Sequence, residues 1–195
     1  CQFLLSSVGS SAYLPVITGE KYRETLNLNH LKTVPHSRKN NHMFRLELKI
    51  PPVALVALFA LAIWFVARMN PWAGVQIPGS EWVALMLLIT GFALIIAGAV
   101  VFISAKTTVN PMTPRLATSI VSSGIYKLSR NPMYVGLFIM LAAWVIFLGN
   151  ILSALLLPLF ILCINRFQII PEENALLEKF GDGYVDYLKS VRRWL

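Results

Sequence analysis

The sequence predicts an all-α integral membrane protein with about four transmembrane helices, and three observations support this fold class. Of the 195 residues, 56% are hydrophobic and only 13% are charged, which is far from the composition of soluble domains. Several long runs carry no charged residue, as a membrane-spanning helix requires. Almost all Lys and Arg residues fall in the segments on one side of these runs. The formal charge of +8 is therefore spread over loops beside apolar spans, and a nucleic-acid partner is not expected.

Residues 1–42 differ from the rest of the chain. They are polar, show no sustained periodicity and contain all three histidines, whereas Met43 opens a short polar lead into an apolar run. We expect residues 1–42 to be a disordered or non-native extension and residues 43–195 to form a single membrane domain. The histidines are unequally spaced, and the two cysteines have no C-x-x-C or Cys/His pattern. No metal site is therefore predicted.

The first two predicted spans are residues 51–67 and 82–105. The first begins with two prolines, which suit a helix N-terminus because the missing N–H is least harmful there. In the second, Gly91 and Gly98 are seven residues apart and so lie nearly on one helical face. Such glycines in a membrane helix favour close helix packing over a ligand groove.

A charge-free stretch of thirty-five residues separates Arg130 from Arg166. This is too long for one ordinary span, and Gly149-Asn150 near its middle provides residues that tolerate positive φ. Each half is about 24 to 28 Å long as a helix, slightly short for a bilayer core of about 30 Å, so both arms can just cross. We therefore predict a helical hairpin with spans at 132–148 and 151–168.

The distribution of basic residues predicts the orientation of these spans. Seven of the 17 Lys and Arg residues precede the first span, four lie in the connector 106–131 and five follow residue 165. Only Arg68 lies on the opposite side. By the positive-inside rule both termini and the connector are expected to be cytoplasmic. We expect the membrane to be a bacterial inner membrane.

The hairpin should bring Arg130 to the same membrane edge as Glu172 and Glu173, although more than forty residues separate them. Taken singly, Arg130 is an interfacial anchor, and the acidic pair after Pro171 suits the first turn of a helix. Together, an arginine that binds a carboxylate or phosphate and glutamates that bind a cation indicate a zwitterionic ligand. The membrane body has no histidine, which disfavours Ser/His or Cys/His hydrolysis.

The C-terminal residues 169–195 read as two short amphipathic helices. Phe180-Gly181 is typical of a helix end, and a second helix is expected from near Tyr184. Its apolar residues recur at helical spacing with basic residues between them. This helix is expected to lie on the anionic inner leaflet, and it could also cover a site.

An ordered set of motifs between about Val101 and Trp194 resembles the membrane methyltransferases typified by isoprenylcysteine carboxyl methyltransferase and its phospholipid N-methyltransferase relatives. The motifs are Gly124-Ile-Tyr126, Arg130-Asn131-Pro132-Met-Tyr134-Val-Gly136, Glu172-Glu173, Leu176-Leu177, Phe180-Gly181, Tyr184 and Tyr187. The resemblance implies S-adenosylmethionine as cofactor, bound near the cytoplasmic face by residues 106–131 and 169–195. It places the catalytic roles on Arg130 and on Glu172 or Glu173. It places cofactor binding on Tyr126, Lys127, Leu128, Ser129, Asn131, Tyr134 and Glu173. Asn131 stands where the family usually has histidine, so this position cannot titrate near neutral pH.

The expected function is S-adenosylmethionine-dependent methyl transfer to a lipophilic small-molecule or lipid-linked acceptor at the cytoplasmic face, among membrane lipids. The acceptor group is expected to be a carboxylate, an amine or a thiol. A carboxylate would need only orientation by Arg130, whereas an amine would need Glu172 or Glu173 to take a proton. Two alternative functions remain open from the sequence alone. One is a nicotinamide-dependent membrane reductase of the sterol-reductase type, and the other is a non-catalytic membrane subunit.

Overall fold

The computed structural model describes residues 50–195 apart from 76, 106–116 and 118, all within one compact unit, Asn41–Leu195. The predicted extension 1–42, the lead from Met43 and the first part of the connector therefore lie outside the described residues, and the predicted domain division stays a prediction. The helical elements in chain order are α3 (Pro52–Met69), η2 (Pro71–Ala73), α4 (Ser80–Ser104), η4 (Gly124–Lys127), α5 (Pro132–Leu148), η5 (Ser153–Leu155), α6 (Leu156–Ile164), the π-helical η6 (Asn165–Ile169), α7 (Ile170–Phe180) and α8 (Asp182–Ser190).

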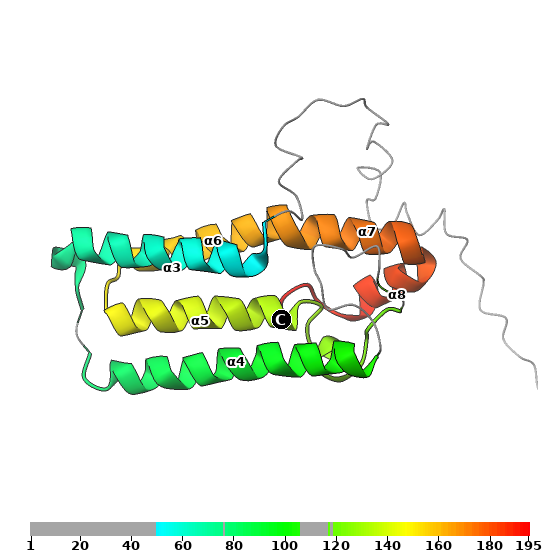
Figure 1. Cartoon of the computed structure of the whole chain (residues 1–195), viewed down its shortest axis with the longest axis horizontal. Coiled ribbons are helices and arrows are strands. Elements are labelled where there is room, and N and C mark those ends of the chain that lie inside the picture. Colours follow the sequence, from blue (N-terminus) through cyan, green and yellow to red (C-terminus); the bar gives the residue numbers. More distant parts are fainter. Residues whose placement is uncertain (1–49, 76, 106–116, 118) are drawn as a thin grey trace, which may run out of the picture. The chain divides into compact units, whose positions relative to one another are not determined.

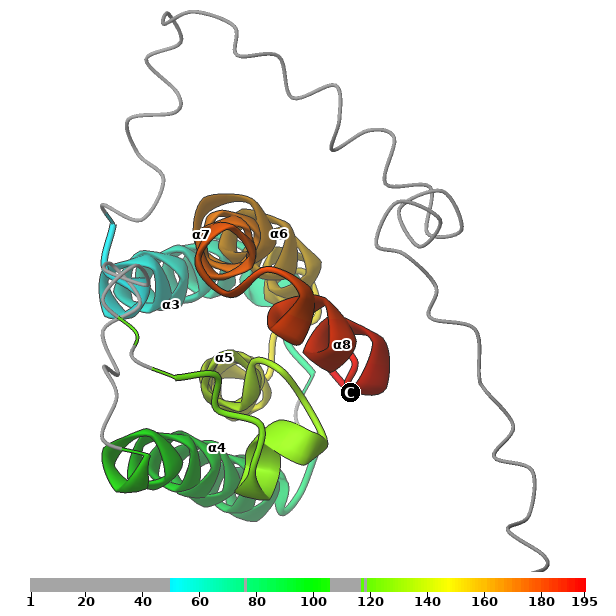
Figure 2. The same ribbon diagram turned by 90° about the vertical axis from the view of Figure 1, so that its right-hand side faces the viewer.

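The all-α membrane fold is confirmed. Three helical stretches are long and apolar enough to cross a membrane, namely Pro52–Met69, Ser80–Ser104 and Ser153–Phe180, and Pro132–Leu148 is a shorter apolar helix. They run alongside one another, with α5 between α4 and the pair of α3 and α6 (Figures 1 and 2). Within the described part of the chain, the only extended pairing is the isolated bridge of Gly74 with Asn150.

The contact between α4 and α5 depends on three glycines. A Cβ atom at Gly91 would lie 2.8 Å from the carbonyl oxygen of Gly136, and one at Gly136 would lie 2.6 Å from the carbonyl oxygen of Gly91. A Cβ at Gly98 would lie 2.6 Å from the Met133 side chain. The backbones approach this closely only because these positions lack side chains, as predicted from the spacing of Gly91 and Gly98.

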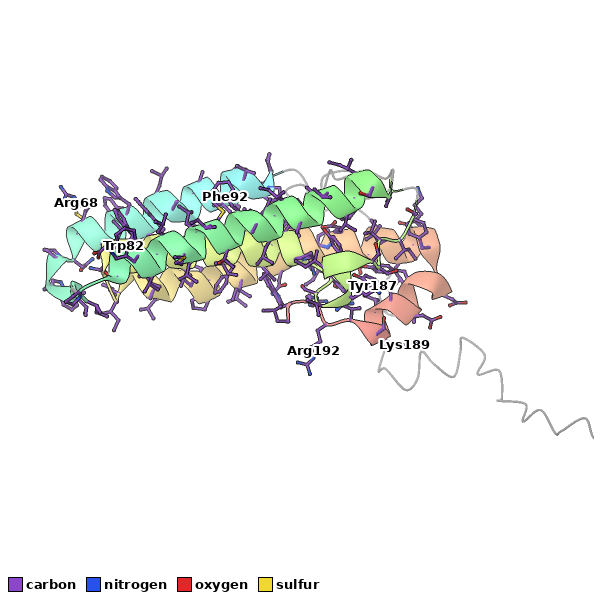
Figure 3. All side chains as sticks on the ribbon, turned by 90° about the horizontal axis from the view of Figure 1, so that it is seen from below. Arg68, Trp82, Phe92, Tyr187, Lys189 and Arg192 are labelled. Atoms are coloured by element: carbon purple, nitrogen blue, oxygen red, sulfur yellow. The ribbon has the colours of Figure 1, made fainter. Side chains whose placement is uncertain are left out.

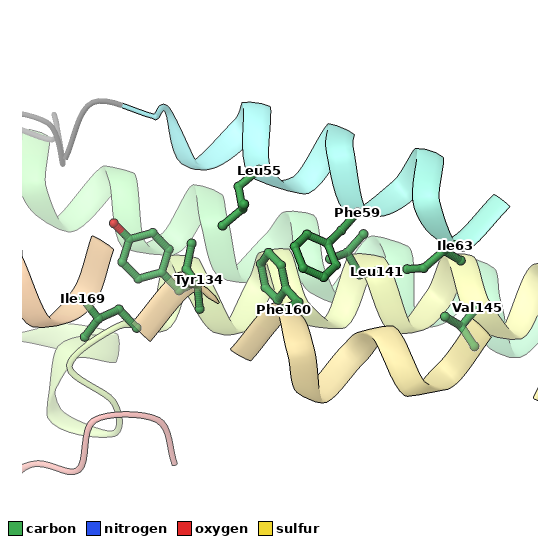
Figure 4. Packing of buried hydrophobic residues seen from close by; sticks show 9 residues of the cluster. Leu55, Phe59, Ile63, Tyr134, Leu141, Val145, Phe160 and Ile169 are labelled. Atoms are coloured by element: carbon green, nitrogen blue, oxygen red, sulfur yellow. The ribbon is translucent and has the colours of Figure 1, made fainter. Parts of the chain in front are cut away.

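The core lies between α3, α5 and α6. Leu55, Phe59 and Ile63 recur every four residues and so form one buried face of α3. They pack against α5 and α6, with the Phe59 and Phe160 rings edge to face at 5.4 Å (Figure 4). Away from the buried residues, α3 and α4 carry exposed apolar side chains, including Phe92 of α4 (Figure 3). These exposed apolar surfaces are consistent with contact to lipid.

The end of the bundle opposite the candidate site is closed by hydrogen bonds between two loops. Gly149 ends α5 with φ 58°, and its carbonyl accepts from Val75 N at 2.6 Å. The buried Asn150 side chain donates to the Asn70 carbonyl at 2.8 Å. The predicted Gly149-Asn150 turn is thus confirmed. Arg68 and Trp82 lie toward this end, whereas Tyr187, Lys189 and Arg192 lie at the other (Figure 3).

The second arm of the hairpin differs from the prediction. A span ending at 168 and a separate helix beginning at Pro171 were expected, but the chain is helical without a break from Ser153 to Phe180. Proline lacks an N–H and crowds the carbonyl four residues before it, and the wider π-helical turn Asn165–Ile169 stands just there. Glu172 and Glu173 therefore do not lie at a free helix N-terminus, so the helix dipole does not explain them.

Candidate functional site

The polar corner between η4 and α5 presents Arg130 and Asn131. Pro132 is the first residue of α5, where its missing N–H leaves no bond unmade. Ser129 is almost completely buried, and its Oγ accepts a hydrogen bond from Asn131 N at 3.1 Å. The Asn131 amide donates to the Arg193 carbonyl at 2.9 Å. The corner is therefore held both by its own side chains and by the residues that follow α8.

The two glutamates lie on α7, which continues the second arm of the hairpin, and both reach this corner. Tyr134, in the first turn of α5, donates from its hydroxyl to Glu172 Oε2 at 3.1 Å. Arg130 Nη2 lies 3.5 Å from Glu173 Oε1. The expected meeting of Arg130 with the acidic pair is thus present in the structure. Because 28 helical residues extend about 42 Å, the end of this helix reaches past a core of about 30 Å, which places the glutamates at its rim.

A cavity of about 370 Å³ opens between these groups. Its polar lining comes from Arg130, Asn131, Glu172, Ser119 and four tyrosines, and the rest is apolar. The lining residues are Pro51, Pro52, Val53, Ile95, Phe102, Ala117, Ser119, Ile120, Val121, Tyr126, Arg130, Asn131, Met133, Tyr134, Leu137, Glu172, Leu176, Tyr184 and Tyr187. This volume is at the lower end of the range for small-molecule sites, about 300 to 1,000 Å³.

Aromatic side chains form much of the cavity wall. The Tyr126 ring packs edge to face on Phe102 at 5.1 Å, and the Tyr187 hydroxyl donates to the Tyr126 carbonyl at 2.8 Å. Tyr184 and Tyr187 of α8 lie 6.0 Å apart between ring centres. α8 therefore covers the cavity, one of the two positions considered for the C-terminal helix.

The tyrosine hydroxyls of this wall remain protonated. Burial, and then the nearby Glu172 carboxylate, raise the pKa of Tyr126 well above its ordinary value. Burial, and then Glu173, do the same to the pKa of Tyr184. Burial raises the pKa of Tyr187 to about 12, partly opposed by the positive charge of Arg130. These groups act as neutral hydrogen-bond partners and as aromatic faces, which attract cations.

The residues singled out from the sequence divide into two groups. Tyr126, Arg130, Asn131, Tyr134 and Glu172 line the cavity. The remaining four lie outside its lining: Lys127 and Leu128 are exposed, Ser129 is buried beneath the corner, and Glu173 is bound in an ion-pair cluster.

Sequence reasoning missed other parts of the site. Phe102, at the end of α4, lines the cavity and was not anticipated, whereas the lining residues 117 and 119–121 fall within the connector 106–131, where cofactor binding was expected. Arg193 binds Glu173 through two contacts, Nη2 to Oε2 at 2.6 Å and Nε to Oε1 at 3.2 Å. Its position among basic residues at the end of an amphipathic helix suggested only a membrane anchor. No spacing rule relates it to Glu173, so no sequence signal distinguished it from Arg192.

The arrangement combines a fixed cation, a carboxylate and aromatic faces in a mainly apolar enclosure. Arg130 can bind a carboxylate, Glu172 can bind an ammonium group or accept a proton, and the tyrosine rings can pack on a heterocycle or a cation. A single ligand with all three features would use Arg130, Glu172 and the tyrosine rings together.

Known proteins are similar to this chain over much of the segment that forms the cavity. A family model described as phospholipid methyltransferase matches residues 80–183, more than half of the chain. A protein of Haemophilus influenzae, described as uncharacterized, is 52% identical over 63 residues, which are 32% of this chain and all of that protein. The protein-S-isoprenylcysteine O-methyltransferase of Schizosaccharomyces pombe is 40% identical over 72 residues, 37% of this chain and 30% of that protein. No solved structure matches the chain.

Proposed function

Because the chain belongs to the phospholipid methyltransferase family, we propose that it transfers the methyl group of S-adenosylmethionine to a lipophilic acceptor, in the cavity beneath α8. The single observation that carries the proposal is the convergence of Arg130, Glu172 and four tyrosines on one cavity at the end of an apolar bundle. The family supports a membrane methyltransferase, and the cavity supports the cofactor and the place of reaction.

The donor set of the cavity fits this cofactor. Its amino-acid end is a zwitterion, for which Arg130 and Asn131 offer hydrogen-bond donors and Glu172 an acceptor. The Tyr126, Tyr184 and Tyr187 rings offer faces for an adenine or for a sulfonium cation. When bound, the cofactor supplies an electrophilic methyl group on a positively charged sulfur.

The apolar side of the cavity suits a lipophilic acceptor. Val53 lines the cavity and is 71% exposed on the outer surface of α3, so the cavity reaches the face that contacts lipid. Ile95, Leu137 and Leu176 continue this apolar wall. An acceptor with a hydrocarbon chain would keep that chain in lipid while its head group enters the cavity.

The residues would then act by position and by exclusion of water. Arg130 orients an acceptor carboxylate, which is already a nucleophile at neutral pH. Glu172 takes the proton from an amine or thiol acceptor, for which a positioned base contributes about 10²–10⁴-fold. The apolar wall keeps competing water from the methyl group, and the fixed geometry supplies most of the acceleration.

The test is transfer of radiolabelled methyl groups by the purified protein in lipid nanodiscs. The two acceptors are an S-prenylated cysteine, which offers a carboxylate, and phosphatidylethanolamine, which offers an amine. We expect label in one lipid-soluble product, and turnover to fall at least about tenfold in Arg130→Ala when the carboxylate is the acceptor.

The matched variants are Glu172→Gln and Glu178→Gln, which each remove one negative charge from α7. Glu172 lines the cavity, and Glu178 lies outside its lining. Glu172→Gln should lower turnover with the amine by about 10²-fold or more, and Glu178→Gln should leave it unchanged. Equal activity in wild type and in both cavity variants would refute the site, and failure of the folded protein to methylate any lipophilic acceptor would refute the function.

A further inference from the structure

The five residues after α8, Val191–Leu195, hold the polar corner of the site. Arg130 N donates to the Arg192 carbonyl at 2.9 Å, and the Asn131 amide donates to the Arg193 carbonyl at 2.9 Å. The Trp194 indole donates to Asn165 Oδ1 at 3.2 Å, in the π-helical turn. This 191–195 segment therefore connects the start of α5 to the helix that carries both glutamates.

Within that connection, Glu173 is bound mainly by Arg193. Both carboxylate oxygens face the Arg193 guanidinium, at 2.6 and 3.2 Å, in the fork arrangement that arginine favours. Arg130 lies farther away, at 3.5 Å from Glu173. The Arg130 Nε is buried and has no hydrogen-bond acceptor among the described residues. Arg130 thus lines the cavity, and its Nε donor has no hydrogen-bond partner among the described residues.

We propose that Arg193 is a positioning residue, which holds Glu173 in a closer ion pair than the one Glu173 makes with Arg130, and so leaves Arg130 to bind a carboxylate of the ligand. This inference rests on the proposed function for the identity of the ligand. The carboxylate belongs either to S-adenosylmethionine or to the acceptor, and the same geometry serves both.

The net charge of this ion-pair cluster determines how well Arg130 can bind a ligand carboxylate. Arg130, Glu173 and Arg193 together carry one net positive charge, and Glu173 and Arg130 are only 12 to 13% exposed, so solvent screens them weakly. Without Arg193, Arg130 is the counter-charge that remains in contact with Glu173 among the described residues. A direct pair between them would be neutral, and the ligand carboxylate would have to compete with Glu173 for the same guanidinium.

The binding test compares Arg193→Ala with Arg192→Ala. Both remove one arginine from adjacent positions and keep the main-chain carbonyls that hold the corner, but Arg192 is exposed. If Arg130 binds the carboxylate of S-adenosylmethionine, calorimetric titration of the protein in nanodiscs should show affinity for this cofactor lowered about tenfold in Arg193→Ala and unchanged in Arg192→Ala. Arg193→Lys should recover part of the loss, because lysine keeps the charge without the fork.

Decarboxylated S-adenosylmethionine distinguishes the two sources of the carboxylate. If Arg130 binds the cofactor, this analogue should bind wild type and Arg193→Ala equally. If Arg130 binds the acceptor, cofactor affinity should stay constant and the KM for a carboxylate acceptor should rise about tenfold in Arg193→Ala. Unchanged cofactor affinity and unchanged KM would overturn the proposal, whereas the proposed function itself fails only if wild type neither binds nor uses the cofactor.

A measurement without ligand tests whether Arg193 weakens the interaction of Glu173 with Arg130, independently of the proposed function. Thermal unfolding of Arg130→Ala, Glu173→Gln and the double variant gives the coupling between these residues, in proteins with Arg193 and again with Arg193→Ala. We expect weak coupling with Arg193 present and stronger coupling, seen as a larger non-additive shift in Tm, once Arg193 is removed. Equal coupling in both backgrounds would contradict the proposal.

Discussion

Tyr134 and Glu172 show how the site depends on single side chains. The tyrosine hydroxyl donates to Glu172 Oε2 at 3.1 Å, across thirty-eight residues of sequence. It is the contact that fixes one cavity carboxylate relative to the start of α5. The sequence predicted that these residues lie at the same membrane edge. Only the side-chain geometry distinguishes Glu172, which lines the cavity, from Glu173, which is bound by Arg193.

Tyr134→Phe removes this hydroxyl and keeps the ring. A hydrogen bond to a buried group contributes about 0.5–1.5 kcal/mol, so we expect S-adenosylmethionine affinity to fall about two- to tenfold with little change in Tm. Calorimetric titration measures it. In a Glu172→Gln background the same substitution should have a much smaller effect, and an undiminished effect there would show that the hydroxyl does not act through Glu172.

At the scale of elements, the spans were predictable because a bilayer imposes long charge-free runs, and α3, α4 and the hairpin each follow one. The continuous helix through Pro171 was not predictable, because a proline next to two glutamates is typical of a helix start. The π-helical turn before it has no comparable sequence signal. The 191–195 segment was missed for a related reason, since it holds Arg130 and Asn131 through main-chain carbonyls, which any residue provides.

The α4–α5 contact gives a prediction about stability. In Gly91→Leu, the new Cβ would lie 2.7 Å from Met140 Cγ and 2.8 Å from the Gly136 carbonyl, so the two helices must separate. We expect a loss of about 1–3 kcal/mol or more in the free energy of unfolding, measured by denaturation in detergent. Ala93→Leu on the same helix points to an exposed position and should leave stability unchanged. Equal stability of the two variants would contradict the close packing.

At the scale of the whole molecule, the bundle has one end closed by loop hydrogen bonds and one end that holds the cavity. The count of basic residues places the cavity end in the cytoplasm, which the structure leaves as a prediction. Cofactor from the cytosol would enter at that end, and a lipophilic acceptor would approach along α3. The two substrates of a methyl transfer would thus come from different phases.

Cysteine labelling tests this orientation. With Cys1 and Cys163 changed to serine, single cysteines are introduced as Trp72→Cys in the closed end and Arg192→Cys beside the cavity. Both positions are exposed. A membrane-impermeant maleimide added to intact bacterial cells should label position 72, and it should label position 192 only after the membrane is opened. The reverse pattern would invert the orientation and place the cavity outside the cell.

Binding of S-adenosylmethionine in the cavity is tested directly by calorimetric titration of the purified protein in nanodiscs with this cofactor. We expect saturable binding at one site, weakened about tenfold or more by Arg130→Ala and by Glu172→Gln, and kept in Glu178→Gln, which removes an equal charge outside the cavity lining. A folded protein that shows no binding, or one that binds equally well in all of these variants, would contradict the account.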